Sequence, residues 1–175
     1  MEKRKPKGFL NFKPFVLAFL LIFSAFLAPS LSADDVIYNS FKQKIMDGSI
    51  DLDTDTIKVA LVTSSYTVSQ DDHEDYADIT NEVPGTGEYV TGGATLASKA
   101  VTKNNTDNVG KFDAADVTWA ASTIANARGA IVYKDSGVAA TSWFIMYIDF
   151  GADKSSTAGD FTLRWHANGI LTLGD

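Results

Sequence analysis

The chain has 175 residues, of which 15 are Lys or Arg and 22 are Asp or Glu, so its net charge at pH 7 is −7. Beyond residue 33 the basic side chains are scattered singly, which excludes a nucleic-acid partner because phosphates require clusters of Lys and Arg. The chain has no cysteine and only two histidines, so disulfides, thiol catalysis and thiolate metal sites are excluded as well.

Residues 1–33 have the pattern of a secretory signal peptide. Five basic side chains stand within the first 13 residues and precede an apolar run over 15–28. That run is shorter than the roughly 20 residues with which a helix spans a bilayer. We expect cleavage after Ser32 or Ala33, an uncleaved membrane anchor being the alternative. The sequence thus predicts a secreted protein, extracellular or at the cell surface, that meets the membrane only through this segment before cleavage.

Residues 34–175 have the size of a single domain with its own core. Their net charge is −11, because residues 1–33 hold five basic residues and one acidic residue. The domain opens with a short helix predicted to place five apolar side chains on one face, with Gly48 ending it. These side chains are Val36, Ile37, Phe41, Ile45 and Met46.

Beyond the helix, the period of the apolar residues becomes that of strands. A central strand is predicted at 57–62, followed by a loop-rich stretch over 63–93 with one helical turn near 71–78. Further strands are predicted at 94–103, 117–119, 127–134, 143–150, 160–165 and 170–173. The pattern indicates an all-β fold, an antiparallel β-sandwich of the jelly-roll or immunoglobulin-like kind with one short N-terminal helix.

The last strands carry two specific expectations. Residues 143–150 are apolar on both faces, which predicts a strand that is central or covered on both sides. Residues 151–160 are predicted to close a hairpin between 143–150 and 160–165, with Phe161, Leu163 and Trp165 pointing inward.

An acidic loop is the candidate metal site of the sequence. Four of its side chains are candidate ligands for calcium or a transition metal, namely Asp71, Asp72, His73 and Asp75. The alternative, a polar surface loop, is the favoured interpretation. Asp51, Asp53 and Asp55 are interpreted as a solvated turn, because the glycine and glutamate of a calcium loop are missing.

No catalytic motif is present, and we expect no enzyme activity, no catalytic residue and no cofactor, calcium being the one ion considered. No G-x-S-x-G elbow occurs, and His166 is predicted to face solvent. Trp119, Trp143 and Trp165 could stack on sugar rings, but packing in the core or at its rim is the favoured interpretation.

Four blocks of the sequence resemble a group of small phage and prophage proteins. They are "YNSFKQKIMDGSIDLDTDTIKVALVTSSYT", "DITNEVPGTGEYVTGGATLASKAVT", "FDAADVTWAASTI" continuing to "ARGAIVYKD", and "IDFGADKSSTAGDFTLRW" continuing to "GILTL". They occur in this order and cover nearly all of residues 38–173. The group is similar to decoration, fibre or other virion components, so the resemblance implies a non-enzymatic structural protein. Its members generally lack a signal peptide, which suggests that this copy serves outside the cell.

Together, the signal and the resemblance predict a subunit of an extracellular or virion-like assembly that forms a homo-oligomer or polymer. The predicted contact is the segment freed by cleavage, with Asp34, Asp35, Val36, Ile37 and Tyr38 as interface candidates. The alternative is a secreted β-sandwich module that binds a glycan or another ligand through the 63–93 loops and an exposed aromatic side chain.

Overall fold

The computed structural model describes residues 35–174, so the predicted signal peptide, Asp34 and Asp175 lie outside the described residues. Among the described residues, no helix is long and apolar enough to cross a membrane. The elements in chain order are β1 (Val36–Ile37), α1 (Asn39–Met46), β2 (Ile57–Thr63), η1 (Tyr76–Asp78), β3 (Ala94–Thr95), β4 (Ala100–Asn104), β5 (Val109–Asp113), β6 (Val117–Lys134), η2 (Ala139–Thr141), β7 (Phe144–Leu163) and β8 (Leu171–Gly174).

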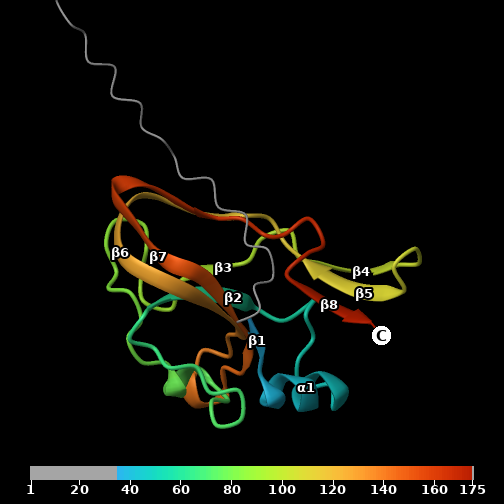
Figure 1. Cartoon of the computed structure of the whole chain (residues 1–175). Helices are drawn as coiled ribbons and strands as arrows, with labels where there is room; N and C mark the ends of the chain where they lie inside the picture. Colours follow the sequence, from blue (N-terminus) through green and yellow to red (C-terminus); the bar gives the residue numbers. More distant parts are fainter. Residues whose placement is uncertain (1–34, 175) are drawn as a thin grey trace, which may run out of the picture.

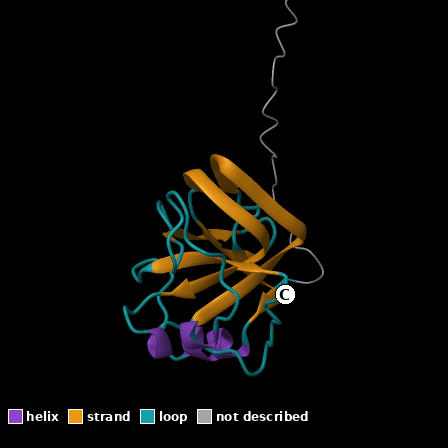
Figure 2. Ribbon diagram, turned by 90° about the vertical axis from the view of Figure 1, so that its left-hand side faces the viewer, coloured by secondary structure: helices purple, strands orange, loops and turns teal. Residues whose placement is uncertain are grey.

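Two antiparallel sheets form the fold, which confirms the predicted all-β, sandwich-like architecture with one short helix. One sheet has five strands in the order β1-β7-β6-β2-β3, and the other has three in the order β4-β5-β8. Buried side chains of both sheets belong to one hydrophobic core. The helices gather at one end of the molecule (Figure 2), whereas β4, β5 and β8 project from its side (Figure 1).

The first half of β7 is the centre of the core. Residues 144–148 are all buried, because β1 and β6 flank them within the sheet and both faces are covered. The prediction of a central strand at 143–150 is therefore confirmed. Phe161, Leu163 and Trp165 are buried too, as predicted.

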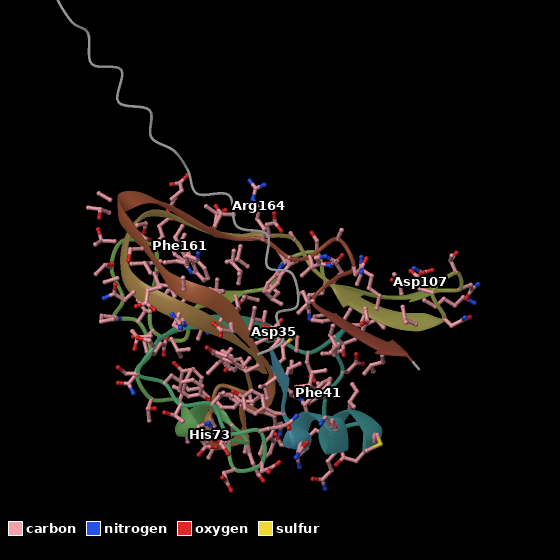
Figure 3. All side chains as sticks on the ribbon, viewed as in Figure 1. Asp35, Phe41, His73, Asp107, Phe161 and Arg164 are labelled. Carbon is pink, nitrogen blue, oxygen red and sulfur yellow. The ribbon has the colours of Figure 1, made fainter. Side chains whose placement is uncertain are left out.

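The start of the domain differs from the prediction. Val36 and Ile37 form the edge strand β1, which pairs with Tyr147 and Met146 of β7, and the helix begins only at Asn39. Of the predicted apolar face, Phe41 is buried (Figure 3), whereas Met46 is 81 % exposed. Extended backbone at Tyr38 separates strand from helix, so the apolar residues on its two sides belong to different elements.

The predicted hairpin over 143–165 is wrong. Residues 144–163 form one strand, β7, which runs antiparallel to β6 from the pair Tyr133↔Phe144 to the pair Val117↔Leu163. Likewise, the predicted strands 117–119 and 127–134 are parts of the single strand β6. Small and polar residues that suggested turns instead lie along this two-stranded ribbon.

The outer half of the ribbon explains that composition. Between residues 119 and 129 of β6 the register with β7 shifts repeatedly, and Ala121 and Ala158 adopt positive φ angles of 47° and 46°. At these bulges the hydroxyl oxygens of Ser155 and Ser156 accept hydrogen bonds from backbone N–H groups of β6, at 3.0 and 3.3 Å. The hydroxyls thus replace ladder bonds that the bulges interrupt.

The predicted strand 94–103 is divided between the two sheets. β3 pairs with β2, whereas β4 pairs with β5, a strand that the sequence pattern did not predict. Backbone with a positive φ at Ser98 turns the chain from one sheet to the other. The predicted helical turn near 71–78 corresponds to the short helix η1.

Candidate self-association surface

The three-stranded sheet has an apolar face that continues past the core. Val101, Phe112 and Leu171 form one row of cross-strand neighbours, and Lys103, Gly110 and Leu173 form the next row on the same face. Phe112 and Leu171 are buried, while Val101 and Leu173 are 54 % and 51 % exposed. The core therefore covers only part of this face.

The opposite face of the same sheet is polar. Thr102, Lys111 and Thr172 form a row there, and the Lys111 ammonium lies 2.9 Å from the carboxylate of Asp113. The difference between the two faces identifies the side with Val101 and Leu173 as the one suited to bury against another protein surface.

Among residues 35–174, both outer strands of this sheet have a neighbouring strand on one side only. β4 and β8 each pair with β5, so the backbone groups on their other sides point away from the sheet. The hairpin of β4 and β5 extends outward, with Asp107 in its end turn (Figure 3). Strand β8 contains no charged side chain, and β4 has only Lys103. Such regular, weakly charged edges are suited to strand pairing between chains.

The edges of the five-stranded sheet are protected in three ways. β1 and β3 have two residues each. Where β6 extends beyond β2, the Glu88 carboxylate accepts the N–H of Ala120, and the N–H of Glu88 donates to the hydroxyl of Ser122. Beyond β1, β7 carries Asp153, Lys154 and several bulges. Short strands, covered edges and charged bulged edges all resist pairing.

The interface candidates that the sequence predicted serve their own domain here. The Asp35 carboxylate accepts the N–H of Asp149 at 2.8 Å, where β1 meets β7 (Figure 3). Tyr38 is fully buried and its hydroxyl lies 3.0 Å from that of Tyr66. This burial raises the pKa of Tyr38 well above its ordinary value. Val36 and Ile37 pair with β7, and Asp34 lies outside the described residues.

The candidate metal ligands are held apart by separate contacts. Asp71 accepts a hydrogen bond from Asn39, Asp72 from Ser69, and Asp75 caps η1. His73 Nδ1 lies 2.8 Å from the Tyr66 hydroxyl. Within residues 35–174 no three His, Asp or Glu side chains are placed to hold a metal ion. In this structure the acidic loop organises the end of the domain near α1.

The three tryptophans do not form an open platform. Trp119 and Trp165 are buried, which confirms the predicted packing role. Trp143 is half-buried, and the Lys44 ammonium lies 4.5 Å from the centre of its ring. One face of the Trp143 ring is thus already covered by a cation.

No protein-family model, no curated protein and no solved structure matches this chain. The resemblance to phage structural proteins therefore stays a prediction. Sequence reasoning placed a strand at 170–173 but did not single out Val101 and Leu173. The signal that could have found them is their position in short strands whose neighbouring residues are mostly Thr, Gly, Lys and Asn.

Proposed function

We propose that the chain is a non-enzymatic structural subunit that is exported and associates with copies of itself. The observation that carries the proposal is the three-stranded sheet, with its two open edges and with Val101 and Leu173 half exposed on one face. The pattern of residues 1–33 supports export.

Charge favours this sheet as the contact between copies. The chain from residue 34 onward has a net charge of −11, so two copies repel each other over most of their surfaces. Contact is therefore most favourable where carboxylates are absent. Strands β4 and β8 satisfy that condition, because Lys103 is their only charged side chain.

The edge strand of a second copy can supply the backbone hydrogen-bond partners that each edge strand lacks. An unpaired strand offers alternating N–H and C=O groups, and a second copy of the same sheet offers the matching set. Strand addition would bring Leu173 or Val101 of both copies to one continuous face. The association would thus combine backbone hydrogen bonds with burial of apolar side chains.

Sedimentation velocity of the purified protein over a range of concentrations tests the proposal. We expect a reversible increase in mass with concentration, and negative-stain electron microscopy of the concentrated samples should show assemblies of regular shape. A monomer at every concentration, in the presence and absence of calcium, would overturn the proposal.

A further inference from the structure

A polar hollow lies on the other sheet, next to the helical end of the domain. Its volume is about 250 Å³, and it is lined by Lys58 of β2, Tyr76 of η1, Gly92, and Tyr133, Asp135 and Ser142. Small-molecule pockets typically enclose about 300–1,000 Å³. The hollow is therefore large enough for one small ring and too small for an extended ligand.

A fixed ion pair forms one wall of the hollow. Lys58 Nζ lies 3.3 Å from Asp135 Oδ2, and both side chains keep about a quarter of their surface exposed, 23 % and 27 %. Asp135 also accepts the N–H of Gly137 at 2.9 Å and the hydroxyl of Ser142 at 3.4 Å. These contacts hold the pKa of Asp135 below its ordinary value, and the hydrogen bond from Gly137 has the largest effect. An ammonium donor and a carboxylate acceptor thus stand side by side in a set position.

Two tyrosine rings form the adjacent wall. The ring centres of Tyr76 and Tyr133 are 4.9 Å apart. Tyr76 donates its hydroxyl proton to the Glu82 carboxylate, and Tyr133 donates to the backbone oxygen of Gly92 at 2.7 Å. Burial raises the pKa of both tyrosines, so both stay protonated. Their hydroxyl oxygens can still accept hydrogen bonds from a ligand.

Gly92 has no side chain to fill the space between the ion pair and the two tyrosine rings. Its φ is +91°, and a Cβ at this position would lie 3.4 Å from Lys58 Nζ and 3.5 Å from the Tyr133 hydroxyl oxygen. A larger residue would fill the space between the ion pair and the rings. The N–H of Gly92 is anchored on Glu82 at 2.7 Å, so the wall is rigid.

We infer that this hollow binds a single saccharide ring, as an activity beyond self-association. Neighbouring hydroxyls of a sugar can donate to Asp135 and accept from Lys58, while the C–H face of the ring packs on the half-buried Tyr76. The one ammonium of the lining, Lys58, is already paired with Asp135, so the wall offers no net positive charge to an anion. The same pairing leaves no net negative charge for a cation. Val138 and Ala139 line the hollow beside the polar groups, which suits a ring that carries both hydroxyls and C–H groups.

The test is NMR titration of the purified protein with glucose, galactose and mannose and with their methyl glycosides. We expect a dissociation constant in the roughly millimolar range for at least one sugar, with shift changes confined to residues around the hollow. A preference for the methyl glycoside indicates the end residue of a longer glycan, and equal binding indicates a free sugar. No shift change with any of the six compounds overturns the inference.

The chain offers a matched control for the ion pair. Lys134 and Asp55 form a second pair, 2.9 Å apart with side chains 21 % and 24 % exposed, outside the hollow. Lys58→Met and Asp135→Asn should weaken sugar binding about tenfold or more, whereas Lys134→Met should leave it unchanged. An equal loss in all three variants would overturn the inference, because it would indicate a general effect on folding.

Discussion

Replacing Val101 and Leu173 together by lysine should strongly weaken self-association without unfolding the domain. Full burial of a Val or Leu side chain contributes about 1.5–3 kcal/mol. Because these two are 54 % and 51 % exposed in the single chain, covering the remainder contributes about 1 kcal/mol each. A β8–β8 contact covers Leu173 of both copies, a β4–β4 contact covers Val101 of both, and a β8–β4 contact covers one of each. Each contact between two copies therefore gains about 2 kcal/mol from these side chains.

That free energy corresponds to roughly a thirtyfold change in the dissociation constant, since about 1.4 kcal/mol is tenfold. Sedimentation velocity of a dilution series measures it directly for the wild type and for the double variant Val101→Lys, Leu173→Lys. Val90→Lys is the matched control, because Val90 is 60 % exposed and lies in a loop that belongs to neither sheet. Exposed substitutions usually change stability by less than about 0.5 kcal/mol. At dilutions where the wild type is monomeric, the melting temperatures of all three proteins should therefore agree.

Two results would refute this reasoning. An unchanged dissociation constant in the double variant would show that the copies meet elsewhere. An equal weakening by Val90→Lys would show that added positive charge, and not the loss of the apolar face, is responsible.

Three further predictions concern stability. Gly93→Ala should destabilise the domain by about 3 kcal/mol or more, because its Cβ would lie 1.8 Å from the Val59 carbonyl oxygen. The buried tyrosines should ionise only as the protein unfolds. Burial raises the pKa of Tyr147 from 10.0 to about 12. The stability that the protonated Tyr147 contributes is therefore complete below pH 10.0 and is lost as the pH rises through 12. Asp135 has the opposite pH dependence, because its pKa is lowered in the folded state. The ionised carboxylate adds stability above pH 3.8, and this stability is lost as the pH falls further.

Each of these has a direct measurement. Urea unfolding should show a smaller cost for Gly137→Ala than for Gly93→Ala, since Gly137 has a similar φ but open space around it; equal costs would remove the clash argument. Tyrosinate absorbance that rises before the circular dichroism changes would contradict the alkaline prediction. In acid, Asp135→Asn should unfold with a weaker pH dependence than the wild type, and parallel curves would speak against the role of this carboxylate.

Strands with a strong local pattern were predictable from the sequence. The runs that became β2 and the first half of β7 are apolar and β-branched, and their burial follows from that pattern alone. The ribbon of β6 and β7 was not predictable, because residues such as Gly151 and Gly159 are typical of turns. Here they lie within one strand, where bulges interrupt the backbone hydrogen bonds between β6 and β7 and serine hydroxyls accept hydrogen bonds from some of the freed N–H groups.

The candidate surfaces depend on contacts that the sequence does not contain. Residues 170–173 were predicted as a strand, yet only the strand order shows that β8 lies at an edge. The hollow unites Lys58, Gly92 and Asp135, which are far apart in the chain and match no motif. For the opening segment, the pattern of apolar residues fits a helix, and pairing with β7 overrides it.

The central position of β5 limits the kinds of assembly that this sheet can make. Because β4 and β8 both run antiparallel to β5, they run parallel to each other. A twofold axis relates each edge to the same edge of the other copy, so it joins β8 with β8 or β4 with β4, and each such contact uses up one edge. A translation joins β8 of one copy to β4 of the next in parallel, and the row then continues. Either way each copy has at most two neighbours through this sheet, so it supports pairs and linear rows but no two-dimensional lattice.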